Sequence, residues 1–82
     1  MGQLVYSPKS LGNVIRRVRK AKKLSQSQTG GPFKLEQSTL SHIEQGVPGT
    51  RIETVFRVLA ALDLEIVIRS KKENDSKIPG AW

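Results

Sequence analysis

Two stretches decide how this chain folds: LSQSQ, residues 24–28, and QSTLSHIEQG, residues 37–46. In the first stretch, Ser25 is a favourable N-cap residue, and the glutamine three positions later completes a capping box. In the second, the only apolar residues, Leu40 and Ile43, are three positions apart and therefore share one face of a helix. The two stretches predict two short helices, the second of which is polar on its outer face.

The ends of these two helices are also marked in the sequence. Gly30, Gly31 and Pro32 follow the start of the first, and because glycine and proline are unfavourable inside a helix, this helix is expected to end early or kink there. Gly46 follows the second and is a typical residue just past a helix end. A short helix, an interruption and another short helix are therefore predicted over residues 25–46.

Longer helices are predicted on both sides of this unit. The first begins with Ser7 as N-cap and Pro8 in the first turn, where a missing N–H costs nothing. The last begins at a capping box formed by Thr50 and Glu53. The apolar residues at helical spacing, which form the expected core faces, are Leu11, Val14, Ile15, Val18 and Ala21 in the first helix and Ile52, Val55, Phe56, Leu59 and Leu62 in the last.

The segment LEIVIR, Leu64–Arg69, has a period of two and many β-branched residues, which predicts a strand. Its partner should be the N-terminal QLVY, residues 3–6, or a second copy of the chain, because a lone strand leaves its backbone groups unpaired. The predicted fold is an all-α, dimeric domain of four to five helices with a short C-terminal β-strand, residues 1–69. The polar residues 70–82 are expected to form a flexible tail.

Length and composition exclude several classes of protein. Eighty-two residues suffice for one small domain but not for two. With no cysteine and one histidine, neither a metal site nor any other cofactor is expected. No nucleophile and base, and no pair of carboxylates, occur at a recognisable spacing, so the chain is not expected to be an enzyme. The absence of a long apolar run or a signal-peptide segment predicts a cytoplasmic protein without membrane contact.

Basic residues are concentrated near the N-terminus. Residues 1–24 hold seven of the 14 lysines and arginines and no acid, whereas residues 25–82 hold seven bases and seven acids. A positive field confined to one part of a domain attracts polyanions, and nucleic acid, anionic lipid or an acidic protein face would each respond to it. RNA is disfavoured because the chain lacks an aromatic platform on which bases could stack.

The two stretches quoted first resemble the helix-turn-helix of the Xre-type, phage-repressor family of DNA-binding domains. The resemblance spans about residues 10–62, and its matching residues are Leu24, Ser25, Gln26, Ser38, Thr39, Leu40, Ser41, Ile43, Glu44 and Gly46. Outside that span, the YSP before the first helix, the run GTRIETVFRVLAALDLEIVI and the terminal tryptophan are similar to the HipB-type antitoxins. Those proteins are dimers that pair with a HipA-type serine/threonine kinase toxin and repress their own operon.

This resemblance implies a sequence-specific transcriptional repressor that binds double-stranded operator DNA as a homodimer and serves as the antitoxin of a HipA-type operon. On DNA it would be associated with the nucleoid. Two alternatives stay open: a toxin-binding module for which DNA binding is secondary, and a stand-alone Xre-type repressor without a toxin.

The chain departs from the family pattern in two places. Where the family has Leu-Ala-x-x-Leu-Gly in and after its second helix, this chain has TGGPFK, residues 29–34, in which Phe33 can replace the lost leucine in the core. Where a glycine commonly ends the first helix, this chain has Lys23. The helix ends at both places are expected to differ from the family's.

The resemblance also implies which residues meet DNA. The helix of the second stretch would enter the major groove, where short amide and hydroxyl side chains reach base edges and glutamine bonds adenine in a bidentate manner. An ordinary solvated helix face is the alternative. The expected base-reading residues are Gln37, Ser38, Thr39, Ser41 and His42.

Gln26, at the positive end of a helix dipole, resembles the family's contact to the DNA backbone. Arg19 and Glu44 match positions that often pair between helices in this family, and such a pair would orient the reading helix, whereas a solvated Arg19 is the alternative. The expected phosphate contacts are Ser25, Gln26, Gln28, Arg19, Lys34 and Arg51.

Two further interfaces are expected. Leu64, Ile66 and Ile68 should form the core of the dimer interface. Trp82 resembles the terminal tryptophan of the HipB-type antitoxins and would enter a pocket on the toxin, since large aromatic residues are good interface anchors. The alternative is that Trp82 belongs to a frayed chain end and binds no partner.

Overall fold

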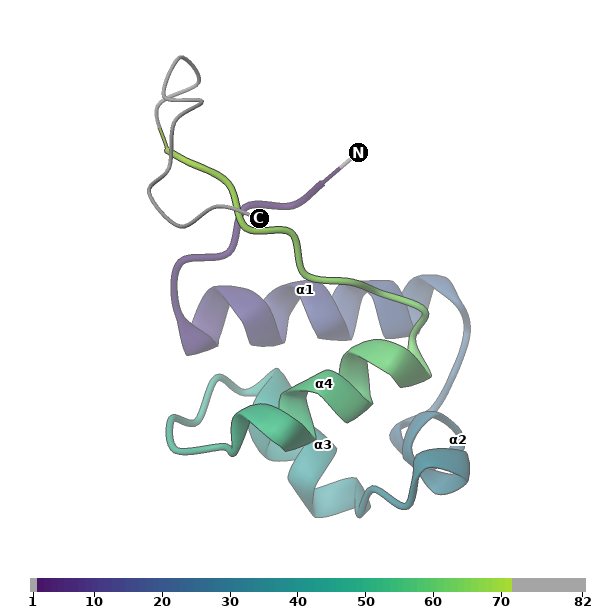
Figure 1. Ribbon diagram of the computed structural model, residues 1–82. Coiled ribbons are helices and arrows are strands. Elements are labelled where there is room, and N and C mark those ends of the chain that lie inside the picture. The colour runs from purple at the N-terminus through teal and green to yellow at the C-terminus, as the bar shows by residue number, and fades with distance from the viewer. Residues whose placement is uncertain (1, 72–82) are drawn as a thin grey trace.

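The computed structural model describes residues 2–71, and in this part of the chain every regular element is helical (Figure 1). The elements are α1 (Pro8–Ala21), α2 (Gln26–Gly30), the 3₁₀ turn η1 (Gly31–Phe33), α3 (Gln37–Glu44) and α4 (Ile52–Ala61). Helix α1 packs against α3, α2 packs against both α3 and α4, and η1 also contacts α4. None of the helices in the described residues has the length and apolar character needed to cross a membrane.

Helix α1 begins where the sequence predicts. Ser7 is its N-cap residue, and Pro8 occupies the first turn. The Ser10 backbone N–H donates to Ser7 Oγ over 3.1 Å, and the Ser7 backbone N–H donates to Ser10 Oγ over 3.0 Å. These reciprocal bonds satisfy backbone donors for which the helix supplies no acceptor, and they determine where α1 starts.

Residues of α1, α3 and α4, together with Leu62 just past the end of α4, form the hydrophobic core. The fully or nearly buried members are Ile15, Leu40, Ile43, Val55, Val58, Leu59 and Leu62. Most of them were expected from the apolar spacing of the sequence. Leu11 and Val18 of α1 are half-buried and pack against this cluster, as their positions on the same helix face predict.

Two expectations for α4 are wrong. Ile52 and Phe56, predicted to be core residues, are 66% and 53% exposed. The core face of α4 is centred on Val55 and Val58, and Phe56 lies about 100° around the helix from Val55, outside that face. The predicted capping box is also missing, because the N-cap residue is Arg51, whose side chain makes no capping hydrogen bond.

The early end of the second helix is confirmed. Helix α2 stops at Gly30 and the chain continues as the 3₁₀ turn η1. A Cβ atom on Gly30 would lie 2.7 Å from the carbonyl oxygen of Leu35, so only glycine lets the chain fold back this closely. The expectation that Phe33 enters the core is wrong. Phe33 is 40% exposed because η1 carries it outward, and Leu35 packs against the core instead.

Helix α1 is followed by a residue in the left-handed conformation that glycine usually adopts at a helix end, but the residue here is Lys23. Lys23 has φ +58°, in the left-handed region, directly after the C-cap residue Lys22. A side chain in this region is strained by about 1–2 kcal/mol.

Replacing Lys23 by glycine should therefore stabilise the protein by about 0.5–1 kcal/mol, because the relief of strain exceeds the entropy that the more flexible unfolded chain gains. Urea unfolding would measure this change. Lys22→Gly is the matched control, since it removes the same charge at an ordinary helical φ of −83° and should destabilise. A loss of stability in Lys23→Gly equal to that in Lys22→Gly would contradict the prediction.

The predicted β-strand at Leu64–Arg69 is also wrong, since residues 2–71 contain no strand. A strand needs a neighbouring strand to satisfy its backbone groups, and the N-terminal segment, residues 3–6, is not a strand either. The Leu64 backbone N–H instead donates to the Leu59 carbonyl oxygen over 2.8 Å, which closes the end of α4. Beyond Leu64, the segment leaves the helical core as an irregular chain (Figure 1).

Candidate nucleic-acid interface

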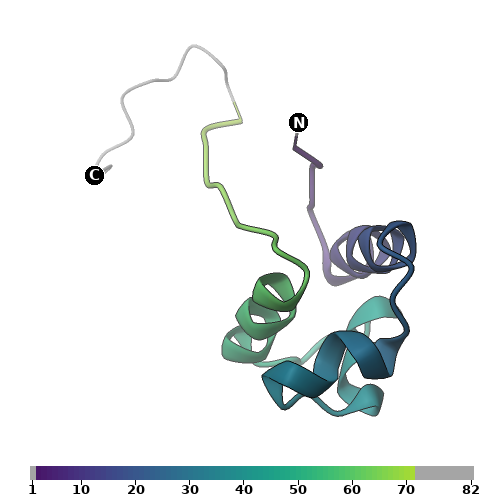
Figure 2. The same ribbon diagram turned by 90° about the vertical axis from the view of Figure 1, so that its right-hand side faces the viewer.

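Helices α2 and α3 form the end of the domain that lies opposite the N-terminal segment and the segment after α4 (Figure 1). The view turned by 90° shows the same arrangement, with α2 and α3 side by side (Figure 2). The two helices are connected through η1 and residues 34–36. The face that they present is therefore not covered by either of the two terminal segments within residues 2–71.

The start of α3 presents polar side chains on this face. Of the five residues predicted to read bases, Gln37, Ser38 and His42 are exposed, whereas Thr39 and Ser41 are half-buried. Ser41 Oγ accepts a hydrogen bond from Gln45 Nε2 over 2.9 Å, so its hydroxyl is held along the helix. Gln37 and Ser38 in the first turn of α3 and His42 in its last turn are consequently the exposed side chains that can meet base edges.

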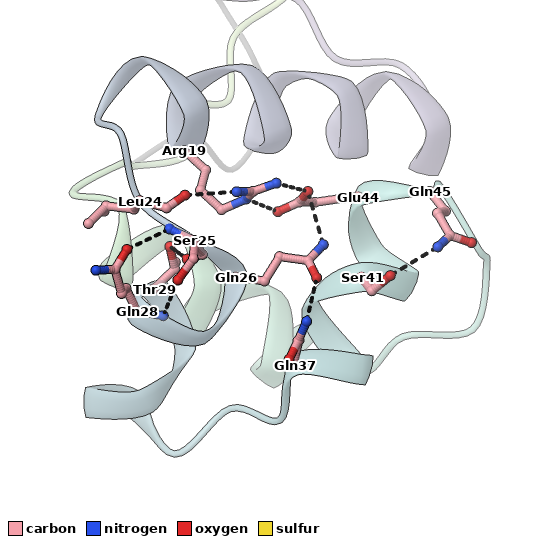
Figure 3. A network of polar contacts seen from close by, with 10 residues as sticks. All are labelled: Arg19, Leu24, Ser25, Gln26, Gln28, Thr29, Gln37, Ser41, Glu44 and Gln45. Atoms are coloured by element: carbon pink, nitrogen blue, oxygen red, sulfur yellow. Dashed lines mark hydrogen bonds and ion pairs between the residues drawn. The ribbon is translucent and has the colours of Figure 1, made fainter.

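A buried ion pair connects α1 to the end of α3 (Figure 3). Arg19 Nε donates to Glu44 Oε2 over 2.6 Å, and Arg19 Nη2 donates to Glu44 Oε1 over 2.8 Å. The side chains are 10% and 3% exposed. The third guanidinium nitrogen, Nη1, donates to the Leu24 carbonyl oxygen over 2.8 Å, just before α2. The predicted pairing of Arg19 with Glu44 is confirmed, and it ties α1, α3 and the chain before α2 together.

The guanidinium of Arg19 and the carboxylate of Glu44 are matched in charge and in hydrogen-bond geometry. The hydrogen bonds to Glu44 hold the pKa of the Arg19 guanidinium above its ordinary value, against the opposite effect of burial. Two parallel N–H···O bonds also fix the plane of the guanidinium, which a lysine at this position would not achieve. The pair therefore sets the orientation of α3 relative to α1.

Gln26 connects the buried pair to the start of α3. Its Nε2 atom donates to Glu44 Oε1 over 3.4 Å, and its Oε1 atom accepts from Gln37 Nε2 over 3.5 Å (Figure 3). Both bonds are long and therefore weak, so they orient the Gln26 amide without fixing it tightly. Gln26 is half-buried at the first position of α2 and stands between Glu44 and the first residue of the candidate reading helix.

Helices α1 and α3 also approach each other closely at Gly12. A Cβ atom there would collide with the carbonyl oxygen of Ile43 and would lie 2.7 Å from that of Glu44. Glycine at this position thus allows two helix backbones to touch. This contact was not predictable from the sequence, because a glycine inside a helix gives no indication of what lies beside it.

The other predicted phosphate contacts differ in how free their side chains are. Ser25 and Gln28 form the predicted capping box of α2, with bonds of 2.8 and 3.0 Å, so both side chains already have partners. Lys34 is exposed at φ +57°, and Arg51 is exposed just before α4. All three guanidinium nitrogens of Arg19 donate inside the protein, and the candidate interface therefore does not include Arg19 as a phosphate contact.

A polar groove of about 550 Å³ lies between α1 and α3 next to this face. It is lined on the α1 side by Lys9, Asn13, Arg16 and Lys20 and on the α3 side by Ser41 and Gln45, with Gln26 at its edge. From the sequence, some basic residues of α1 could contact phosphates beside the major groove or could form an ordinary solvated face, and both interpretations were left open. Their spacing was the available signal, but only the packing of α1 on α3 shows that they flank a groove.

The residues predicted to form the dimer interface lie away from this face. Leu64 is half-buried against the core, whereas Ile66 and Ile68 are 47% and 91% exposed. Their role in a dimer interface stays a prediction. Trp82 and residues 72–81 lie outside the described residues, so the predicted tail and its contact with a toxin stay predictions as well.

Two short helices packed against each other, with polar side chains at the exposed start of the second, define a helix-turn-helix protein. The chain belongs to the Helix-turn-helix family, whose model matches residues 15–68.

The relatives within this family are more specific. The chain is 30% identical over 70 residues to antitoxin HipB of Escherichia coli strain K12, a match that covers 85% of this chain and 80% of HipB. It is also similar to HipB in a structure of the HipA–HipB–O2–O3 complex, with a TM-score of 0.81, 30% identity and coverage of 87% of this chain and 100% of that chain. The HipB–O4 20mer complex matches with the same TM-score of 0.81. The resemblance to HipB-type antitoxins is confirmed.

Proposed function

We propose that this chain is a sequence-specific DNA-binding repressor and the antitoxin of a HipA-type kinase operon. Helix α3 enters the major groove of operator DNA, Gln37, Ser38 and His42 reach base edges, and Gln26, Lys34 and Arg51 contact the backbone. The observation that carries the proposal is the buried pair Arg19–Glu44, which holds α3 in one orientation and leaves its polar start exposed.

The relatives support both parts of this proposal. The similar solved structures are a HipA–HipB–O2–O3 complex and a HipB–O4 20mer complex. A rigid reading helix is what base recognition requires, because a bidentate contact depends on the position of both partners.

Replacing Gln37 by alanine should weaken operator binding by about 1–3 kcal/mol and leave binding to non-specific DNA nearly unchanged, because a base contact is lost while the phosphate contacts stay. Fluorescence anisotropy at one salt concentration would measure both affinities. Gln3→Ala is a suitable control, since it removes an exposed amide from the N-terminal segment, which lies at the opposite end of the domain from α2 and α3 (Figure 1). Equal losses of affinity for the two DNAs would exclude a base-reading role for Gln37.

The partner kinase is tested separately. Deleting Trp82 should leave operator affinity unchanged and weaken binding to the kinase of the neighbouring gene by about 2 kcal/mol, as expected for an interface anchor. Calorimetry with each partner measures both quantities. Unchanged kinase affinity would contradict the role of Trp82, and no binding by the full chain would favour a stand-alone repressor. Kinase binding without operator binding would favour the alternative in which DNA binding is secondary.

A further inference from the structure

We propose that the α1 side of the groove beside α3 is a second DNA-backbone site, in which Lys9, Arg16 and Lys20 bind successive phosphates of one strand and Asn13 donates to the same strand. This inference rests on the proposed DNA-binding function and extends the contact surface beyond the helix-turn-helix itself. The ligand chemistry is that of the phosphodiester backbone, so the site adds affinity for any DNA sequence and no preference among sequences.

The four side chains form one stripe on α1. Their positions are i, i+4, i+7 and i+11, which fall within about 60° of one another around a helix. All four are exposed and line the same groove. From Lys9 to Lys20 the stripe is about 16 Å long, because each helical residue adds 1.5 Å, and this is enough to follow several phosphates of one strand.

Charge in the groove favours a polyanion. Its lining includes Lys9, Arg16, Lys20 and Arg19 and a single carboxylate, that of Glu44. The Glu44 carboxylate accepts both hydrogen bonds from Arg19, so the three stripe cations face the groove without a carboxylate of their own. A concave surface lined by one sign of charge concentrates its field, which an exposed convex face does not do.

The groove is continuous with the proposed reading surface. Gln26 lines its edge and accepts a hydrogen bond from Gln37, the first residue of α3. At the other end of α3, Gly46 at φ +79° lies against the backbone of Lys9, and a Cβ atom on Gly46 would be 2.6 Å from Lys9 Cα. The stripe therefore passes across the C-terminal end of α3, in the groove that Gln26 also lines, and a DNA strand bordering the major groove that holds α3 would pass along it.

The test compares two triple variants of the full chain that lose the same charge. The first variant, Lys9→Gln with Arg16→Gln and Lys20→Gln, removes the three positive charges of the stripe. The matched control replaces Arg17, Lys22 and Lys23 by glutamine, residues that are exposed but do not line the groove. Affinity for operator DNA and for a scrambled duplex is measured from 0.05 to 0.5 M NaCl, and thermal unfolding checks that each variant is folded.

For each bound protomer of the stripe variant, the slope of log affinity against log salt should become shallower by about 2–3, and affinity at 0.1 M salt should fall by about 10²–10³-fold on both duplexes. The control should change the slope by less than about 1. A charge-conserving variant, Lys9→Arg with Arg16→Lys and Lys20→Arg, should keep the slope of the unmodified protein.

Equal slopes for the stripe variant and the control would overturn the inference while leaving the proposed function intact, since the α1 cations would then act only through their long-range field. A large loss for the operator alone would overturn it too, because backbone contacts carry no sequence information. If the unmodified chain bound neither duplex, the proposed function and this inference would fail together.

Discussion

Replacing Arg19 by methionine should destabilise the protein by about 3–5 kcal/mol, because the Glu44 carboxylate would stay buried without a partner. Glu44 accepts two bonds from Arg19 and only one further, long bond from Gln26, over 3.4 Å. No cation other than Arg19 forms an ion pair with Glu44 in the described residues. Urea unfolding followed by circular dichroism gives the free energy of unfolding.

The double variant Arg19→Met with Glu44→Leu separates two explanations of that loss. If the cost comes from the uncompensated carboxylate, removing both charges should recover most of the stability, since an apolar pair of similar volume avoids the desolvation penalty. If the single variant is largely unfolded, recovery of a cooperative transition in the double variant still decides the matter. A loss below about 1 kcal/mol in the single variant would mean that the pair behaves as an exposed one.

Gly12→Ala should also be strongly destabilising, by about 3 kcal/mol or more. The added methyl group would collide with the carbonyl oxygen of Ile43 and crowd that of Glu44, and both atoms belong to a helix backbone. A side chain can change rotamer to make room, but a helix backbone has to move as a whole. The resulting shift of α3 would strain the bonds between Arg19 and Glu44.

Gly31→Ala is the matched control for this substitution. Gly31 has helical angles, φ −52° and ψ −54°, and a Cβ atom there would meet nothing within 4 Å. The change in stability should stay within about 1 kcal/mol, because alanine restricts the unfolded chain but is disfavoured at helical angles directly before Pro32. Thermal or urea unfolding of both variants provides the comparison. Similar stabilities for the two alanine variants would contradict the close approach of α1 and α3.

The buried pair was predictable only in part. Arg19 and Glu44 are 25 residues apart, and nothing in their local sequence says that they meet. Their pairing was expected because both match positions of a known family, whereas composition and spacing alone allowed a solvated Arg19. Arg19 was also expected to contact a phosphate, but its three guanidinium nitrogens all donate inside the protein.

The polar start of α3 was easier to predict. Leu40 and Ile43 must face the core, and a helix period then directs Gln37, Ser38 and His42 elsewhere. The basic stripe of α1 is a different case. Its spacing is visible in the sequence, but a row of cations becomes a groove only when a second helix packs beside it.

The sequence by itself determined the features that depend on neighbouring residues. The caps at Ser7 and Ser25, the early end of α2 at Gly30 and the end of α3 before Gly46 follow from hydrogen bonds and backbone preferences within a few positions. Such local interactions act before any tertiary contact exists, so they can be read from a short stretch of chain.

Tertiary structure alone decided the contact at Gly12, the exposure of Phe56 and Phe33, and the absence of a strand at Leu64–Arg69. Each of these depends on what another part of the chain places alongside. Leu64–Arg69 has the β-branched residues of a strand, but a strand is a pairing of two segments, and backbone hydrogen bonds form only where a second segment lies within reach.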